Sequence, residues 1–125
     1  MIVGLGIDVM EVERMASALR EHGGRLEERV FTEAERAACA SRADRVLALA
    51  ARFAAKEACM KALGTGWAGG LGFRDVEVVR EGEGAPRLVL SGEAARRAAG
   101  LGVVRSHVSL SHQPGLAAAV VILER

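Results

Sequence analysis

The stretch "RFAAKEACMKALGTG", residues 52–66, ends a segment that we expect to form the central helix of the fold. At the helical period, one apolar stripe of the segment is formed by Leu49, Ala50, Phe53 and Met60. Most of the other positions are alanine, and a helix that is apolar almost all round is typical of a buried position. We therefore predict a long helix from about Asp44 to Leu63, which the "GTG" sequence ends.

Glu57 is the exception on this helix, because its carboxylate falls inside the apolar stripe, one turn from Phe53. A buried carboxylate is costly unless a cation or hydrogen-bond donors meet it. One interpretation is an ion pair within the helix between Glu57 and Lys61, whose i,i+4 spacing is worth about 0.2–0.5 kcal/mol. The other is that Glu57 binds a ligand, and the helix alone leaves both open.

A second acid in an apolar setting, Asp8, favours the ligand role. It lies in "GLGIDVMEVER", residues 4–14, in the part that we expect to be a buried strand. Two acids on core-facing elements, with no histidine or cysteine nearby, suit a hard cation such as Mg²⁺, which keeps its remaining positions for water and phosphates. Lys61 then faces the same phosphates, and the glycines at 64–66 allow close backbone approach to an anion. The sequence thus predicts a magnesium-assisted diphosphate site.

Working outward from these stretches, the periodicity predicts strands and helices along the rest of the chain. A first strand at 1–9 leads into a helix from Met10, which "HGG" at 22–24 ends. "FTEAER" at 31–36 is a capping box, with Thr32 as the cap and Glu35 reaching back. After the long helix we expect a hairpin of two strands, at 73–79 and 87–90. A short helix at 92–99 follows, and then two neighbouring strands at 103–111 and 116–123. The order β-α-α-α-β-β-α-β-β indicates an α+β fold, a mostly antiparallel sheet packed with a long central helix.

Composition limits the classes of function. The 125 residues are 50% apolar and 26% charged, with a formal net charge of +1, which suits one globular domain, residues 1–125. Near-neutral charge and a single tryptophan, Trp67, argue against nucleic acid as a partner. The longest apolar run, 115–123, is too short to span a membrane. We expect a cytoplasmic protein with reduced Cys39 and Cys59, because the N-terminal residues lack a signal-peptide profile.

Other motifs are weaker. "GLGIDV" lacks the third glycine of a dinucleotide fingerprint, and "GTGWAGG" follows a helix and lacks the Lys-Ser/Thr of a P-loop. In "SLSHQ", residues 109–113, Ser109 and Ser111 share a strand face and His112 lies at the strand end. These residues are either edge-strand hydroxyls with a turn histidine or contacts to a phosphate or ribose.

The motifs taken together resemble the holo-acyl-carrier-protein synthases, the small bacterial 4'-phosphopantetheinyl transferases. The similarity lies in "GIDVMEVER", "FTEAE", "RFAAKEACMKALGTG" and "SLSH", whose order and spacing agree over nearly the whole chain. It implies the 4'-phosphopantetheinyl transferase-like fold. It also implies transfer of the 4'-phosphopantetheine arm from coenzyme A to a serine of apo-acyl-carrier protein, which releases adenosine 3',5'-bisphosphate and supports fatty acid biosynthesis. The family further implies a homotrimer with active sites at subunit interfaces.

The resemblance also assigns roles to residues. Asp8 and Glu57 are implied as the Mg²⁺ ligands, with Glu57 also as a proton acceptor, and Lys61 as a phosphate ligand and catalytic residue. For coenzyme A, it implies Lys61, Gly64, Thr65, Gly66 and His112. For the acidic carrier protein, it implies contacts from Arg14 on the first helix, together with Arg20 and Arg25. The alternative interpretation of Arg20 and Arg25 is that they belong to an ordinary solvated face. Glu35 has two interpretations, a capping box or a role in orienting the water or the serine.

Two other classes of function remain to be separated from the transferase by experiment. One is a coenzyme A- or nucleotide-binding module without catalysis, which needs Lys61 and the "GTG" glycines but not both carboxylates. The other is a structural trimeric adaptor, which needs no acids on apolar faces. The presence of both Asp8 and Glu57 favours the transferase.

Overall fold

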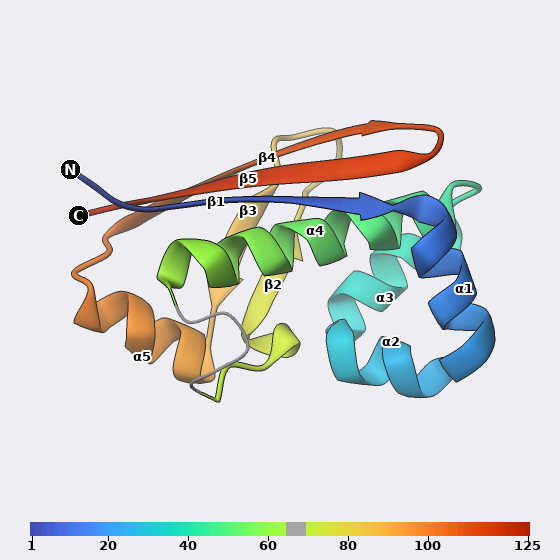
Figure 1. Ribbon diagram of the computed structural model, residues 1–125, viewed down its shortest axis with the longest axis horizontal. Helices are drawn as coiled ribbons and strands as arrows, with labels where there is room; N and C mark the ends of the chain where they lie inside the picture. The colour runs from blue at the N-terminus through green and yellow to red at the C-terminus, as the bar shows by residue number, and fades with distance from the viewer. Residues whose placement is uncertain (65–69) are drawn as a thin grey trace.

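The computed structural model describes residues 1–64 and 70–125 (Figure 1). Its elements follow the chain in the order β1 (Ile2–Glu11), α1 (Val12–His22), α2 (Gly24–Val30), α3 (Glu33–Ala40), α4 (Arg45–Leu63), the 3₁₀ turn η1 (Phe73–Asp75), β2 (Val76–Val79), β3 (Arg87–Leu90), α5 (Gly92–Gly100), β4 (Arg105–Gln113) and β5 (Leu116–Glu124). The α+β class, the long central helix and the antiparallel pairing are confirmed. Within the described residues, no helix is long and apolar enough to cross a membrane.

The predicted order is wrong at one point, because four helices rather than three separate β1 from β2. The additional helix, α2, begins directly after the glycine that ends α1. Gly23 has φ of 56° and ψ of −135°, a conformation that breaks one helix and lets the next start at once in a new direction. The sequence "HGG" predicts only the end of a helix, and the seven residues of α2 are too few to show a clear period.

A three-stranded antiparallel sheet of order β1-β5-β4 forms one layer, and α4 lies along one of its faces (Figure 1). The helix comes very close to β1 because two positions of that strand carry no side chain. A Cβ atom at Gly6 would lie 1.8 Å from the carbonyl oxygen of Ala58, and one at Gly4 would lie 2.2 Å from that of Ala62. Glycine in β1 and alanine in α4 therefore let the two backbones pack directly.

The core lies between α4 and this sheet. Alternate residues of β5 turn toward the helix and are buried: Ala117, Ala119, Val121 and Leu123. The helices lie on one side of the sheet (Figure 1), and the other face carries exposed apolar side chains of β1. These side chains are Leu5, Ile7 and Val9, which are 64%, 63% and 52% exposed. A row of large apolar side chains on one sheet face is usually covered by other parts of the protein or by a partner.

A buried ion pair ties α4 to the rest of the chain. The Nζ atom of Lys56 lies 2.6 Å from Oε1 of Glu35, and it also donates to the carbonyl oxygens of Phe73 at 3.0 Å and Val76 at 2.5 Å. Burial lowers the pKa of Lys56, and the charge and hydrogen bond of Glu35 oppose that shift. The pair joins α4, α3 and the start of β2, and so fixes the position of η1.

Candidate active site

Asp8 and Glu57 meet at one cavity, as the sequence predicted. Asp8 lies on the α4 side of β1, two residues beyond Gly6, and Glu57 lies on the part of α4 that packs against that strand. Both line a cavity of about 330 Å³, together with Arg14 of α1. The other lining residues are mostly apolar, Phe53 and Phe31 among them. The cavity thus has two carboxylates and one guanidinium in surroundings that strengthen electrostatic interactions.

Lys61 reaches across from α4 to β1 rather than along its own helix. Its Nζ atom donates to the backbone oxygen of Ile7 at 2.9 Å and to Oδ1 of Asp8 at 3.1 Å. In the described part of the chain, no ion pair joins Lys61 to Glu57, so the interpretation of Glu57 as half of an intrahelical pair is wrong. The Lys61 side chain is 54% exposed, which leaves its ammonium group accessible to a ligand.

The pKa of Glu57 is raised above its ordinary value. The largest cause is burial of the carboxyl group, and the negative charge of Asp8 acts in the same direction. The positive charges of Lys61 and Arg14 oppose the shift but do not cancel it. The nearby positive charges therefore do not fully offset burial and repulsion at Glu57, and a further cation beside the two carboxylates would relieve the repulsion.

The donor set suits a hard divalent cation. Asp8 and Glu57 offer carboxylate oxygens, and the cavity contains neither histidine nor cysteine. Within residues 1–64 and 70–125, no group of three or more acidic, histidine or cysteine side chains is placed to hold a metal. Mg²⁺ commonly takes only one or two protein carboxylates and fills its other positions with water and phosphate oxygens, so two ligands are sufficient.

His112 does not share this cavity. It lies near the end of β4, the strand on the far side of the sheet from β1, and lines a second cavity of about 180 Å³. The basic side chains that line this cavity with it are Arg42, Arg52 and Arg80. Ser109 and Ser111 face the other way, because they pair in register with Val120 and Ala118 on the uncovered side of the sheet. The "SLSH" motif is therefore divided between two faces.

Arg52 is a residue of this second cavity that sequence reasoning missed. Its side chain is buried, and its Nε atom has no hydrogen-bond partner among the described residues. An unpartnered buried guanidinium nitrogen is costly, and an anion in the cavity would satisfy it. The available signal was an arginine in an otherwise apolar helix, within the quoted "RFAAKEA" stretch. The sequence does not show that the fold brings Arg52 and His112 to the same cavity.

Gly64 caps α4 in the left-handed conformation, with φ of 80°, which only glycine adopts readily. Its neighbour Leu63 accepts a hydrogen bond from Nε of Arg97 at 3.0 Å, so α5 holds the end of the catalytic helix in place. The predicted coenzyme A contacts Thr65 and Gly66 lie outside the described residues.

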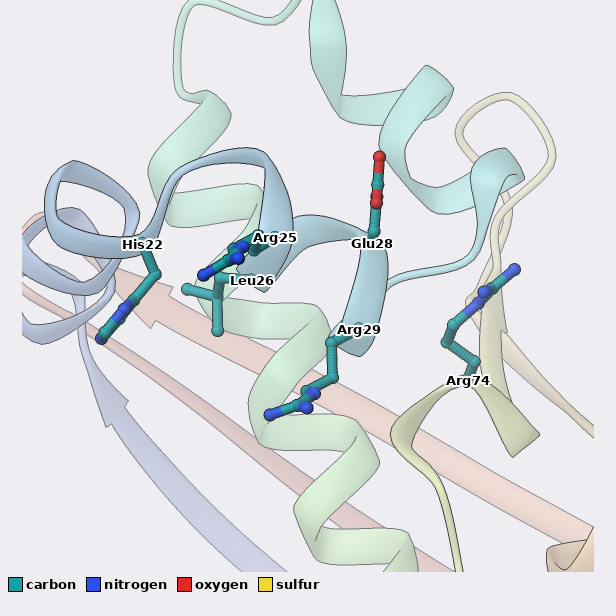
Figure 2. Close-up of a pocket in the computed structure, with 6 residues that line it drawn as sticks. All are labelled: His22, Arg25, Leu26, Glu28, Arg29 and Arg74. Atoms are coloured by element: carbon teal, nitrogen blue, oxygen red, sulfur yellow. The ribbon is translucent and has the colours of Figure 1, made fainter.

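The three arginines predicted for carrier docking lie in different environments. Arg14 lines the carboxylate cavity itself. Arg20 is exposed and bonds to Glu13 of the same helix at 2.9 Å. Arg25 lines a separate, larger hollow (Figure 2). The structure thus brings Arg14 to the site and leaves the other two on the neighbouring surface.

Glu35 forms the capping box that the sequence predicted. Its Oε1 atom accepts from the backbone of Thr32 at 2.9 Å, and Thr32 accepts from the backbone of Glu35. Oε2 accepts from the backbone of Val78 at 2.8 Å, and Lys56 neutralises the charge. Because both oxygens are used and the residue is buried, the structure supports the capping role and not a role in orienting a water or serine.

Comparison with known proteins identifies the family. The profile of the 4'-phosphopantetheinyl transferase superfamily matches residues 4–121. A holo-[acyl-carrier-protein] synthase of Koribacter versatilis is 51% identical over 124 residues, which cover 99% of each chain. The crystal structure of the synthase from Neisseria meningitidis superposes with a TM-score of 0.91 at 30% identity, covering 100% of both chains. That from Bacillus anthracis, in complex with CoA (3',5'-ADP), gives 0.80 at 37% identity, covering 98% of this chain and 96% of the other. This chain therefore belongs to the 4'-phosphopantetheinyl transferase superfamily and, within it, to the holo-[acyl-carrier-protein] synthases.

Proposed function

We propose that this enzyme transfers 4'-phosphopantetheine from coenzyme A to a serine of apo-acyl-carrier protein at the cavity lined by Asp8 and Glu57. The observation that carries this assignment is the meeting of Asp8 and Glu57, from two elements far apart in the sequence, at one partly apolar cavity, with Lys61 bonded to Asp8 beside it. Two acids and a lysine in such a place are costly for folding alone, and they suit a diphosphate and a divalent cation.

The residues divide the work of the reaction. The serine oxygen of the carrier protein attacks the β-phosphorus of coenzyme A, and the bond to the leaving adenosine 3',5'-bisphosphate breaks. Lys61 offsets negative charge on the phosphate oxygens, since its ammonium group is accessible and held beside Asp8. Glu57 is the residue proposed to accept the serine proton, since its carboxylate lies in the cavity beside Asp8.

Asp8 and Glu57 are the residues that would hold Mg²⁺. When bound, the ion supplies positive charge for the diphosphate and its leaving group. Asp8 is oriented for this role by Lys61, which bonds to its carboxylate and to the preceding backbone carbonyl. Arg14 at the cavity wall contributes a further positive charge near Glu57.

Coenzyme A would contact Lys61, Gly64, Thr65, Gly66 and His112 in this proposal. His112 has the surroundings of a phosphate contact, because the cavity that it lines also contains three arginines, one with an unpartnered buried nitrogen. In one chain this cavity is separate from that of Asp8 and Glu57. One coenzyme A molecule can meet both groups of residues if they come from neighbouring copies of the chain.

A homotrimer with active sites at the subunit interfaces accounts for this separation. The uncovered sheet face supports the assembly, because it presents Leu5, Ile7 and Val9 to solvent in a single chain. Exposed apolar residues in a row on a flat sheet favour burial against another copy.

For the carrier protein, we propose docking on α1 and the start of α2, with Arg14, Arg20 and Arg25 as the basic contacts. Arg14 lines the carboxylate cavity, Arg25 lines the hollow that shares Leu26 with it, and Arg20 is exposed on α1. We further propose that residues 1–125 act as one domain, in the cytoplasm, in the supply of holo-carrier protein to fatty acid biosynthesis. Cys39 and Cys59 are both free and buried, which suits a reducing compartment.

Intact-mass measurement of the carrier protein tests the proposal. Apo-carrier protein is incubated with the enzyme, coenzyme A and Mg²⁺, and we expect its mass to rise by one phosphopantetheine arm. A parallel reaction with a chelator in place of Mg²⁺ should show little transfer, and an unrelated active phosphopantetheinyl transferase serves as the positive control. An unchanged mass beside a working control would contradict the proposal and favour a binding module without catalysis.

A further inference from the structure

A hollow on the surface lies beside the carboxylate cavity, between α2 and η1. It has a volume of about 890 Å³ and is lined by side chains from the end of α1, from α2 and from η1: His22, Arg25, Leu26, Glu28, Arg29 and Arg74. Figure 2 shows Arg25 and Arg29 projecting from α2, while Arg74 comes from the separate segment that runs beside it. Three cations from two elements therefore share one surface depression.

These three guanidinium groups have no counter-charge of their own. In the part of the chain that the structure describes, the side chains of Arg25, Arg29 and Arg74 form no ion pair or hydrogen bond. Glu28 is the one acid that lines the hollow, and its side chain projects away from Arg25 and Arg29 (Figure 2). Other exposed arginines, such as Arg20 and Arg96, do pair with nearby glutamates. A cluster of unpaired cations attracts an anionic partner.

The position of Arg74 is fixed by buried contacts rather than by a free loop. The preceding residue, Phe73, is buried, and its carbonyl oxygen accepts a hydrogen bond from Nζ of Lys56. The following residue, Asp75, accepts from the backbone of Gly72 at 3.3 Å and closes the turn. The helix that carries Glu57 and Lys61 therefore also helps to position Arg74, through the bond from Lys56 to the residue before it.

The hollow adjoins the carboxylate cavity. Leu26 lines both of them, with Glu57 and Asp8 on one side and the three arginines on the other. A protein that places a serine hydroxyl in the cavity would therefore have the hollow next to its contact surface. The side chains that line the hollow are mostly exposed, which suits a broad protein contact better than an enclosed small-molecule site.

We propose that Arg74 is a carrier-protein docking residue, which completes with Arg25 and Arg29 a binding hollow for the acidic side chains of the incoming protein. This inference rests on the proposed function, since it takes the carrier protein as the partner. It adds η1, an element far along the chain from α1 and α2, to the docking surface. Arg74 acts by steering and holding the substrate protein and touches none of the reacting atoms.

The role predicts a specific kinetic pattern. Exposed charges at the rim of an interface act mainly on association and on its salt dependence. Arg74→Glu should raise the KM for carrier protein about threefold to tenfold, since charge reversal also adds repulsion. The value of kcat and the KM for coenzyme A should not change. Arg74→Lys should stay close to wild type, because it keeps the charge.

Steady-state kinetics with varied carrier protein, at low and at moderate salt, measures this pattern. Arg96→Glu is the matched control, because it makes the same charge change at an exposed position on α5, away from the hollow. Arg25→Glu is the comparison for a docking residue on α2. We expect the KM for carrier protein to rise in Arg74→Glu and Arg25→Glu but not in Arg96→Glu, and to depend less steeply on salt in the first two.

An unchanged KM in Arg74→Glu, with a raised KM in Arg25→Glu, would overturn the inference and leave the proposed function intact. An equal rise in Arg96→Glu would also overturn it, since net charge alone would then explain the effect. If the wild-type enzyme adds no phosphopantetheine to any carrier protein, the proposed function itself fails, and this result is visible before any variant is made.

Discussion

Glu57 is the residue on which the proposed transfer site depends most. It lies on a helix whose buried side chains are mostly apolar, and its pKa is raised by burial and by Asp8. A fold gains nothing from such a placement without a cation. The free enzyme should therefore carry a measurable free-energy cost at the site, and that cost should depend on pH and on metal.

The pH dependence of stability has a definite sign. Because the folded state holds the Glu57 proton at higher pH than the unfolded chain does, ionisation of this group destabilises the metal-free protein. The loss begins near the ordinary glutamate pKa of 4.5 and is complete once the pH passes the raised pKa of the folded state. Glu57→Gln should remove this loss, so the variant should be at least as stable as wild type at neutral pH when both lack metal. Chemical denaturation of both proteins at pH values from about 4 to about 8 measures the difference in their free energies of unfolding.

Glu83→Gln is the control for that experiment, since Glu83 is exposed in the turn between β2 and β3. Its stability profile should follow that of wild type. Added Mg²⁺ should stabilise wild type and Glu83→Gln but not Glu57→Gln, because a ligand of the folded state stabilises it by mass action. Coincident profiles for all three proteins, with and without Mg²⁺, would show that Glu57 is not strained by its position and holds no cation.

At the residue scale, the sequence was a good guide to single misplaced charges. Asp8 and Glu57 could be predicted because a carboxylate on an apolar face is rare and needs a physical reason. The contact of Lys61 with Asp8 could not be predicted, because it depends on how α4 crosses β1. Arg52 and Arg74 were missed for the same reason, since each gains its meaning from neighbours on other elements.

At the scale of elements, the packing of α4 against β1 places the site. The helix and the strand touch through backbone atoms at Gly4 and Gly6, and this approach brings Glu57 to Asp8. The small residues at this contact are therefore as important for the site as the charged residues are.

Gly6→Ala should disrupt this packing. Its Cβ would lie 1.8 Å from the oxygen of Ala58 and 2.9 Å from the nitrogen of Ala62, and backbone atoms cannot move aside as a flexible side chain does. We expect the free energy of unfolding to fall by about 3 kcal/mol or more, measured by chemical denaturation. Gly24→Ala is the matched control, because nothing lies within 4 Å of a Cβ there and alanine favours its helix. Equal stability of Gly6→Ala and wild type would refute this account of the helix–strand contact.

Elements with a strong period were predictable, and short ones were not. The long helix α4, the β4–β5 hairpin and the capping box of α3 each follow from a pattern that spans several turns or residues. Helix α2 was missed because its seven residues follow glycines that also mark a turn. Its conformation is decided by packing, since Val30 is buried and Leu26 contacts the core.

At the scale of the whole molecule, two features of the single chain support the proposed trimer. The apolar face of β1 is exposed, and the basic cavity of His112 is separate from the carboxylates. Sequence periodicity cannot show either feature, because both depend on which strands are neighbours and on which face the helices cover. The proposed trimer accounts for both together.

Ile7→Asp tests the assembly. Ile7 is 63% exposed on the uncovered sheet face, so the variant should fold as a single chain but place a charge in the interface. Light scattering should give the mass of three chains for wild type and of one chain for the variant, and the variant should lose transferase activity. Val89→Asp, a similar change at an exposed position on β3, should remain trimeric. A wild-type mass of one chain, or an unchanged mass in Ile7→Asp, would be inconsistent with this interface.

The most direct test of the central claim is the initial rate of phosphopantetheine transfer, followed by intact mass of the carrier protein, in Glu57→Gln. The change keeps the shape of the side chain and removes both the metal-binding charge and the proton acceptor. The account predicts a rate at least about 100-fold below wild type at saturating Mg²⁺, while Glu83→Gln remains at the wild-type rate. A Glu57→Gln rate within a few-fold of wild type would contradict the claim that the Asp8–Glu57 cavity is the site of transfer.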